Sequence, residues 1–492
     1  MASLEELRAT RIEKLELLKK AGMNPFPAKV PRTTCLADAK ANFAEGKAYS
    51  VVGRVMAIRG QGAIIFIVLD DGKAKFQAVF KKDAFEAAGT ADFFELFTKA
   101  IDIGDFISVT GTFFTTQRGE QSILVTSWVI AAKALLPLPE KWHGITDSDE
   151  RYRKRYLDFV MNPELRDVFY KKAKFWEVTR RVMNQHGFLE VETPTLEVTT
   201  GGAEAAPFKT HHNDFDLPVY MRISIGELWQ KRLMAGGFQK TFEIGRAYRN
   251  EGSSPDHLQE FTNMEFYWAY ADYKDGMELT QELYRTIATE VFGTTKFTSR
   301  GHTFDLADEW KLINYVDEIK AQTGIDVIAA SEDDMKKKLQ ELKVKYDGEN
   351  KERLTDTLWK YCRKNISGPA FLVDHPLIVG PLAKPVIDEK GVAQPKVQMF
   401  QPLFAGSEVG RGYSELNDPI DQKARFDAQA KLLAAGDTEA MMPDYEFVEM
   451  LEHGMPPTCG FGFGERVFAI LMDKPIREMQ TFPLMRPKEE GK

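Results

Sequence analysis

Hydrophobic and polar residues alternate along several short stretches between residues 49 and 132. A period of two is typical of half-buried β-strands, because successive side chains point to opposite faces of the sheet. Glycine-containing turn signals at 60–62, 70–72 and 118–120 separate the stretches. The predicted strands are YSVVGRVMAIR (49–59), AIIFIVLDD (63–71), AKFQAVF (74–80), DFISVTGTFFTTQ (105–117) and QSILVTSWVI (121–130).

Five short strands with one helix candidate at 82–98 favour a small five-stranded β-barrel of the OB type. Many OB barrels bind nucleic acid, but the pattern fits a small barrel without that role equally well. Ahead of the barrel, apolar residues at helical spacing predict a helix over 3–20, which Gly22 and the prolines at 25 and 27 end.

The pattern changes after Pro163. An apolar stripe at helical spacing covers residues 165–183, and Gly187 fits a helix stop. Beyond it, strand candidates joined by short turns mix with helices, which favours a mainly antiparallel sheet flanked by helices and hence an α+β fold. The predicted strands are 188–192, 219–224, 240–249, 261–270, 370–373, 399–405 and 460–463, and the predicted helices are 226–234, 274–291, 308–323, 332–342, 353–364, 418–435 and 445–453.

These patterns divide the chain into parts. We predict a helix and lead-in at 1–48, the barrel at 49–135, a linker at 136–160 and a second domain at 161–492. Residues 293–368 are rich in charge, and we expect them to be an inserted helical segment without a chemical role.

Composition limits the classes of protein that the chain can represent. Its three cysteines stand far apart and form no CxxC pair, so neither a zinc site nor a disulfide framework is indicated. There is no signal-peptide-like segment and no run of about 18 apolar residues, so we expect a cytosolic protein and no membrane span. A net charge of −8 means that any RNA binding would depend on local basic sites.

The segment from 242 to 273 carries the strongest chemical signal. Two predicted strands flank a polar loop that holds Arg249, Glu251 and His257, and Phe261 begins the second strand. Arginine binds phosphate through two parallel hydrogen bonds, an aromatic ring stacks on a purine, and a glutamate accepts from an exocyclic amine. This is a natural nucleotide cradle, although the same residues also fit an ordinary charged hairpin.

The motif RNEG, followed by His257 and EFTNMEFYWAYADYKDGMELT, resembles motif 2 of class II lysyl-tRNA synthetases. Further segments resemble other parts of that family in the family's order. They are GRVMAIRGQGAIIFIVLDDGKAKFQ (53–77, the anticodon-binding OB barrel), GFLEVETPTL (187–196, motif 1), TGGAEAAPFKTHHNDFDLPVYMRIS (200–224), GYSELNDPIDQKARF (412–426) and LEHGMPPTCGFGFGERVFAIL (451–471, motif 3). The resemblance covers residues from about 49 to 487, with a weak patch at 293–368.

For the nucleotide, the resemblance implies that Arg249 contacts the α-phosphate and Arg466 the γ-phosphate of ATP. It implies that Glu251 and His257 flank the nucleotide and that Phe261 stacks on adenine. The lysine carboxylate would attack the α-phosphorus, and a tRNA ribose hydroxyl would then take the lysyl group from the adenylate. Magnesium would bridge the phosphates.

For lysine, the resemblance implies a pocket of carboxylates and aromatic rings. We expect Glu265 and Glu415 to hold the ε-ammonium and Glu227 the α-ammonium, with Tyr267 and Tyr413 beside them. For tRNA(Lys), the residues predicted to read the anticodon are Arg59, Phe66 and Gln77. Phe66 also fits a simple barrel-core residue. Motif 1 implies a homodimer.

The sequence departs from the family at four places. Arg411 stands where an asparagine is usual, and Gln401 stands where a metal-binding glutamate is often found. We therefore predict Glu408 and Glu415 as the metal ligands. Motif 3 is one residue short before Glu465, and the segment before Glu227 is one residue long.

Three other functions fit parts of this pattern. The same fold could activate aspartate or asparagine, a reading that Arg411 favours and the three pocket glutamates oppose. The chain could be a non-catalytic paralogue that binds RNA through the barrel, or an enzyme that aminoacylates a protein lysine.

Overall fold

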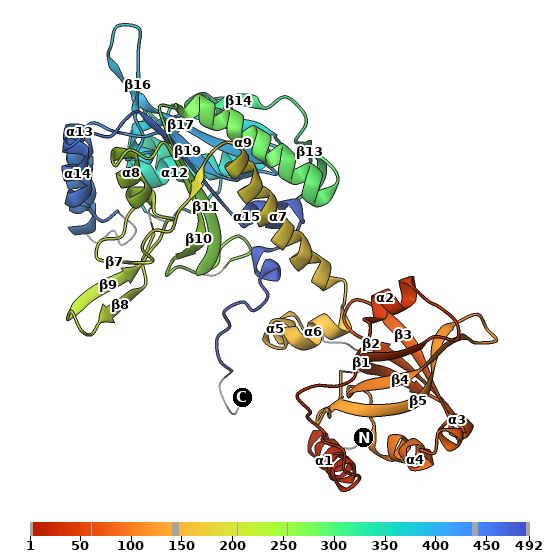
Figure 1. Cartoon of the computed structure of the whole chain (residues 1–492). Coiled ribbons are helices and arrows are strands. Elements are labelled where there is room, and N and C mark those ends of the chain that lie inside the picture. Colours follow the sequence, from red (N-terminus) through yellow and green to blue (C-terminus); the bar gives the residue numbers. More distant parts are fainter. Residues whose placement is uncertain are drawn as a thin grey trace. The chain divides into compact units, whose positions relative to one another are not determined.

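The computed structural model describes residues 3–60, 62–139, 147–203, 205–252, 254–346, 348–434 and 441–488. The chain forms two compact units, Met1–Arg166 and Asp167–Lys492 (Figure 1). Part of the predicted turn at 60–62, part of the predicted linker at 136–160 and the last residue of the predicted helix at 418–435 lie outside the described residues.

The first unit is built on a closed five-stranded barrel with the strand order β1-β2-β3-β5-β4. Alternate side chains such as Ile65, Ile67 and Leu69 are buried inside, while their neighbours along the strand face outward. This confirms the predicted OB-type barrel. The strands are β1 (Ala48–Arg59), β2 (Ile64–Asp70), β3 (Lys75–Lys81), β4 (Phe106–Thr115) and β5 (Gln121–Ala132).

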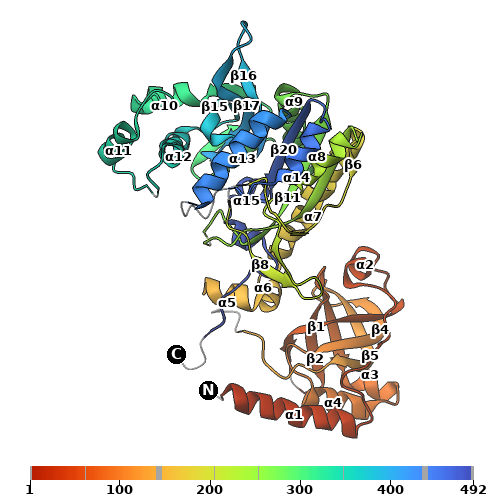
Figure 2. The same ribbon diagram turned by 90° about the vertical axis from the view of Figure 1, so that its left-hand side faces the viewer.

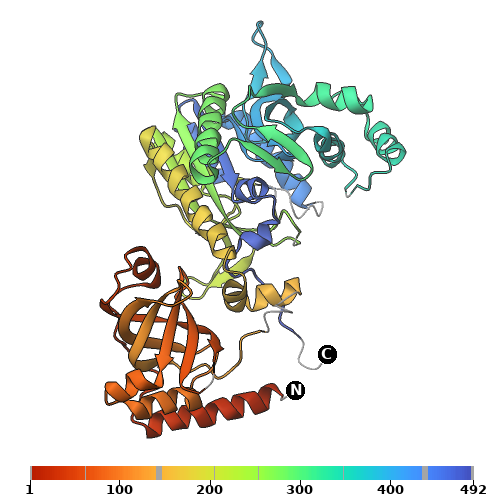
Figure 3. The same ribbon diagram turned by 90° about the vertical axis from the view of Figure 1, so that its right-hand side faces the viewer.

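Helices cover the barrel, and α1 packs against α4 (Figure 3). The single helix predicted at 82–98 is wrong: it is two helices, because Gly89 turns the chain with a φ of +71°. The helices of this unit are α1 (Leu4–Lys20), α2 (Leu36–Ala41), α3 (Lys82–Ala87), α4 (Ala91–Ala100), α5 (Ser148–Arg153) and α6 (Arg155–Met161).

The second unit is built on a sheet with the order β14-β15-β17-β19-β20-β11-β10-β6, with β16 and β18 paired to β17 (Figure 2). Its strands are antiparallel except for the pairs β14–β15 and β10–β6, which confirms the mainly antiparallel prediction. The strands are β6 (Leu189–Glu190), β10 (Lys240–Tyr248), β11 (Glu260–Ala269), β14 (Lys311–Asn314), β15 (Ala370–Pro376), β16 (Pro385–Ile387), β17 (Ala393–Phe404), β18 (Ser407–Glu408), β19 (Arg411–Ser414) and β20 (Thr458–Gly464).

One face of this sheet is apolar and packs on helices α7, α9 and α15. Phe266 of β11 and Phe461 and Phe463 of β20 share one core with Phe175 of α7 and Leu283 of α9. Smaller sheets and the remaining helices complete the unit. They are β7 (Leu196–Glu197), β8 (Lys209–His212), β9 (Leu217–Met221), β12 (Lys296–Ser299), β13 (His302–Asp305), α7 (Leu165–Gln185), α8 (Glu227–Ala235), α9 (Tyr273–Ile287), η1 (Ala288–Phe292), α10 (Tyr315–Thr323), α11 (Glu332–Glu341), α12 (Lys351–Cys362), η2 (Arg363–Asn365), η3 (Leu377–Val379), α13 (Pro419–Ala434), α14 (Tyr445–Glu452), α15 (Arg466–Leu471) and η4 (Ile476–Met479).

Two element predictions need correction in this unit. The predicted helix at 308–323 begins only at Tyr315, where the Asn314 side chain accepts hydrogen bonds from the backbone of Val316 and Asp317. The residues just before it form β14, an edge strand of the main sheet. The strand at β19, which holds part of the GYSELND segment, was not predicted.

No helix in the described part of the chain is long and apolar enough to span a membrane.

Candidate active site

A cavity of about 420 Å³ opens on the polar face of the main sheet in the second unit. Every residue predicted from the sequence for ATP, lysine or metal binding lines it, although these residues come from segments far apart in the chain. They are Glu227, Arg249, Glu251, His257, Phe261, Glu265, Tyr267, Glu408, Tyr413, Glu415 and Arg466.

The period of two along β11 and β20 makes this cavity. Phe261, Asn263, Glu265 and Tyr267 of β11 line it, while Met264 and Phe266 lie in the apolar core. On β20 the cavity-facing positions are glycines. A Cβ at Gly460 would lie 2.1 Å from Glu415 Oε1, and a Cβ at Gly462 would lie 2.7 Å from the Glu265 side chain. The glycines therefore leave the space that the carboxylates occupy.

At one end of the cavity lie three buried carboxylates and a lysine that the sequence reading missed. Lys231 Nζ lies 2.5 Å from Glu415 Oε2 and 3.0 Å from Glu227 Oε1, and Lys231 is itself 1% exposed. The ring of Tyr413 lies 5.5 Å from this ammonium. The i, i+4 spacing of Glu227 and Lys231 on one helix was visible in the sequence, but such pairs are usually solvent-exposed.

Glu265 is held differently from the other two carboxylates. Its oxygens accept hydrogen bonds from the backbone N–H of Ile225 at 2.8 Å and from the Tyr267 hydroxyl at 3.1 Å. Among the residues that the structure describes, it has no cationic partner. Tyr413 donates a hydrogen bond from its hydroxyl to Glu227.

Burial and mutual repulsion shift the proton affinities at this end. Burial, with a contribution from the Glu227 charge, raises the pKa of Glu265 to about 7. Burial also raises the pKa of Glu415 to about 8, against the opposing charge of Lys231. Burial disfavours the charged form of Lys231, but its two carboxylate neighbours outweigh that cost and raise its pKa. When all are ionised, three carboxylates and one ammonium leave this end with a formal charge of −2.

The other end of the cavity carries guanidinium groups. Arg249 follows β10, donates from Nε to the Ile223 carbonyl at 3.3 Å and lies over the Phe261 ring at 5.3 Å. Its terminal nitrogens have no hydrogen-bond partner among the described residues. Arg466 opens α15; its Nε is buried without a partner, and its Nη2 lies 4.0 Å from Asp256 Oδ2.

His257 also lines this cavity, and its Nδ1 forms a hydrogen bond with Ser254 Oγ at 2.7 Å. Burial, reinforced by the positive charge of Arg466, lowers the pKa of His257 below its usual value, so the ring is neutral at pH 7. Glu251 lines the same end of the cavity. Arg466 lines this end, and Glu465 beside it is hydrogen-bonded to the backbone of Thr262.

The segment at 293–368, for which no chemical role was expected, supports this end of the cavity. Arg300 pairs with Asp256 and bonds to Ser407 Oγ at 3.1 Å. Arg363 forms an ion pair with Glu408, which also accepts a hydrogen bond from the Trp359 indole. Burial, with the nearby positive charge of Arg466, lowers the pKa of Arg363 to about 10.

The predicted anticodon residues lie together on the outer surface of the barrel in the first unit. Arg59 of β1 is paired directly with Phe66 of β2. Gln77 of β3 is paired with Val68, which lies two residues after Phe66 on β2. Phe66 is 37% exposed, so it is not a barrel-core residue. Gln77 Nε2 donates to Ser122 Oγ at 2.9 Å.

Comparison with known proteins agrees with this geometry. A family model described as tRNA synthetases class II (D, K and N) matches residues 147–486, and one described as an OB-fold nucleic acid binding domain matches 49–131. Lysine–tRNA ligases of Roseiflexus sp. (strain RS-1), Thermosynechococcus vestitus and Thermotoga maritima are 40%, 42% and 39% identical to the chain. The alignments cover 99% of this chain and 100%, 98% and 97% of those relatives.

The chain belongs to the lysine–tRNA ligases, a family of class II aminoacyl-tRNA synthetases.

The predicted family and fold class are therefore confirmed, and the class uses ATP.

One part of this ligase's cavity does not fit the prediction of a metal site. Both Glu408 and Glu415, the predicted metal ligands, are already paired with cations of the protein, Arg363 and Lys231. Gln401 Oε1 accepts a hydrogen bond from His375 Nε2 at 2.8 Å. In the described residues there is no group of three or more His, Cys, Asp or Glu side chains that could hold a metal ion. The donors at this place do not fit a magnesium ion held by the protein, which needs free carboxylate oxygens.

Proposed function

We propose that this chain activates L-lysine with ATP and transfers the lysyl group to tRNA(Lys). The observation that supports this most directly is the division of the cavity into an anionic end and a guanidinium end. The two ammonium groups of lysine are complementary in charge to the anionic end, and the phosphates of the nucleotide are complementary to the guanidinium end. Their reactive groups, the lysine carboxylate and the α-phosphate, would then meet between them.

For lysine, the proposal assigns Glu265 and Glu415 to the ε-ammonium and Glu227 to the α-ammonium. The two ammonium groups of lysine balance the formal charge of −2 at this end. Lys231 holds Glu227 and Glu415 in place before the substrate arrives, and the rings of Tyr267 and Tyr413 give the ammonium groups a favourable environment. An aspartate side chain would be repelled by the same carboxylates.

For ATP, the proposal assigns Arg249 to the α-phosphate and Arg466 to the γ-phosphate, with Phe261 stacked on adenine and Glu251 and His257 beside the nucleotide. The lysine carboxylate attacks the α-phosphorus and pyrophosphate leaves, so no side-chain nucleophile is needed. The arginines contribute by stabilising the charge that collects on the phosphates in the transition state. Magnesium enters as part of the substrate, bound to ATP through phosphate oxygens.

For tRNA, the proposal assigns anticodon recognition to Arg59, Phe66 and Gln77 on the outer face of the barrel. Base stacking on an aromatic ring contributes roughly 1–3 kcal/mol per base. Phe66→Ala should therefore weaken tRNA charging and leave lysine-dependent pyrophosphate exchange unchanged. Equal loss of both activities would contradict the assignment.

The proposal includes a homodimer formed through the edge of the sheet at motif 1. Leu189 of β6, Leu196 of β7 and Val198 expose 51%, 52% and 59% of their surface. Burying them against a second copy would remove apolar surface from water. Sedimentation should show a dimer, and an active monodisperse monomer would contradict it.

Pyrophosphate exchange measured with each of the twenty amino acids tests the function. Lysine should give the highest exchange rate. Strongest exchange with aspartate or asparagine would overturn the lysine assignment. Binding of tRNA without adenylate formation from any amino acid would instead indicate a non-catalytic RNA-binding protein.

A further inference from the structure

Arg411 lies across the glycines of β20 from a pocket carboxylate. On the sheet, Glu265 is paired with Gly462, and Gly462 is paired in turn with Arg411 of β19. Side chains at paired positions point to the same face, and two strand spacings separate Glu265 and Arg411 by roughly 10 Å. Gly462 has no side chain, and the Glu265 side chain lies over it, 2.7 Å from where a Cβ would stand. Arg411 lines the same cavity as Glu265.

The Arg411 guanidinium is not engaged by the protein. It is exposed, and it has no hydrogen-bond or ion-pair partner in the described part of the chain. A second guanidinium lies near it: the positive charge of Arg411 contributes, after burial, to lowering the pKa of Arg249. Two guanidiniums that disfavour each other's charge gain from an anion placed between them.

Around the same place, the acidic and amide oxygens are already occupied. Glu408 is held by Arg363 and Trp359, and Gln401 is bonded to His375. Burial lowers the pKa of His375 to about 3, so this imidazole stays neutral and the Gln401 contact carries no charge. At this place the cavity therefore offers Arg411, a cation without a partner among the described residues, while Glu408 and Gln401 already have partners.

We propose that Arg411 is a catalytic residue that binds the reacting α-phosphate together with Arg249. Its fixed positive charge replaces the charge of a metal ion held by protein carboxylates. The inference rests on the proposed function, because it concerns the ATP of that same reaction. An arginine can bind two phosphate oxygens through its planar fork of N–H groups, and it needs no acidic ligands of its own.

This role acts on the transition state more than on substrate binding. Negative charge on the α-phosphate rises when the carboxylate attacks, so loss of the guanidinium should lower kcat more than it raises the KM for ATP. Free magnesium beyond the amount bound to ATP should partly replace the missing charge. In the unmodified enzyme, activity should saturate once magnesium matches ATP.

The test is lysine-dependent pyrophosphate exchange by the full chain over a magnesium titration. R411A should lose about 10- to 100-fold in kcat when magnesium equals ATP, since a hydrogen bond to a charged group is worth that much. Excess magnesium should recover part of the loss. R411K keeps the positive charge but not the planar fork of N–H groups, so its kcat should fall between those of R411A and the unmodified enzyme.

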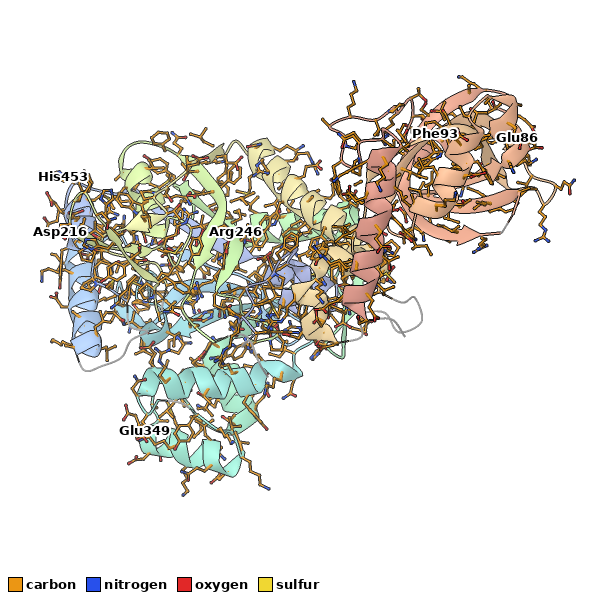
Figure 4. All side chains as sticks on the ribbon, turned by 90° about the horizontal axis from the view of Figure 1, so that it is seen from below. Glu86, Phe93, Asp216, Arg246, Glu349 and His453 are labelled. Carbon is orange, nitrogen blue, oxygen red and sulfur yellow. The ribbon has the colours of Figure 1, made fainter. Side chains whose placement is uncertain are left out.

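The matched control is R246A. Arg246 lies on β10 of the same sheet (Figure 4) and pairs with Glu260 at 3.3 Å. It is not among the residues that line the cavity. R246A should keep the magnesium profile of the unmodified enzyme. A rate for R411A within twofold of the unmodified enzyme at every magnesium concentration would overturn the proposal, and so would an equal loss in R246A.

A second variant tests whether Glu408 binds the metal. E408Q should leave the magnesium concentration for half-maximal activity unchanged, whatever it does to the maximal rate. A tenfold rise in that concentration would show that Glu408 binds the metal and would overturn the proposal. If the unmodified chain exchanges pyrophosphate with no amino acid, the proposed function fails; if it does so with lysine while R411A is unaffected, only the role of Arg411 fails.

Discussion

The two ends of the cavity are prepared for their ligands in opposite ways. At the carboxylate end, the protein supplies a counter-ion of its own, Lys231, and the carboxylates are buried and hydrogen-bonded before substrate arrives. At the guanidinium end, Arg249 and Arg411 keep terminal nitrogens that bond to nothing in the described structure.

The difference follows from the cost of burying charge. A buried carboxylate without a partner would simply take up a proton, so an end built from three of them needs a resident cation. An arginine stays charged even when partly buried, and it can wait for its anion while in contact with solvent. The proposed lysine site is therefore part of the folded core, whereas the proposed phosphate site would be completed by its ligand.

The largest effect should come from removing the Arg249 guanidinium, whose terminal nitrogens have no hydrogen-bond partner among the described residues. Arg249→Ala should lower the rate of adenylate formation by about 10³- to 10⁵-fold, the range for an arginine that stabilises a phosphoryl transition state. Because Arg249 makes one long hydrogen bond to the backbone, the unfolding midpoint should change little. Quench-flow measurement of lysyl-adenylate together with urea unfolding checks both parts, and a near-normal rate would remove Arg249 from the mechanism.

Removing Lys231, the cation that the protein itself supplies at the carboxylate end, should lower the free energy of unfolding. Lys231→Ala leaves Glu227 and Glu415 buried and facing each other, and breaking a buried pair costs about 3–5 kcal/mol. Urea unfolding followed by tryptophan fluorescence measures this loss. Lys423→Ala is the matched control, because Lys423 also forms an i, i+4 pair but is exposed to solvent; that variant should unfold like the unmodified protein. If Lys231→Ala and the control unfolded at the same urea concentration, the buried pairs of Lys231 would not stabilise the fold.

A smaller effect should come from filling the space beside the carboxylates. At Gly460→Ala the new Cβ would meet Glu415 Oε1 at 2.1 Å and the Tyr267 ring at 2.6 Å. Overpacking of this kind costs about 1–3 kcal/mol. The KM for lysine should rise about tenfold with an unchanged KM for ATP, as read from pyrophosphate exchange. A change confined to the KM for ATP would mean that the glycine belongs to the nucleotide end.

A change of pH, which alters only the protons of the site, should also act on lysine binding. In the free protein the pKa values of Glu265 and Glu415 are raised to about 7 and about 8, and only the ionised carboxyls attract ammonium groups. As pH falls through 8 towards 6, these groups are protonated and lysine affinity should fall, by up to about tenfold per unit of pH for each proton that must leave. Calorimetric titration with lysine between pH 6 and 8.5 checks this. Binding of ATP, measured the same way, should change less, and constant lysine affinity would contradict the shifted pKa values.

Local patterning allowed much of the architecture to be predicted. The alternation between residues 49 and 132 predicts the barrel strands, because a period of two can bury one face only in a sheet. The segments around Arg249, Glu265 and Arg466 predict cavity residues through their resemblance to a family. The helix break at Gly89 and the strand before Tyr315 were missed, since a single glycine or an edge strand changes the hydrophobic pattern very little.

The sequence by itself determined the fold class, the family and a set of side chains that line the cavity. Only the tertiary structure decided how those side chains are paired: Lys231 with Glu227 and Glu415, Arg363 with Glu408, and Arg411 with nothing described. Pairing depends on distances of a few ångströms between residues far apart in the chain, and periodicity along the chain carries no information about such distances. The charge state and availability of each group, and with them the chemistry, were therefore set by packing.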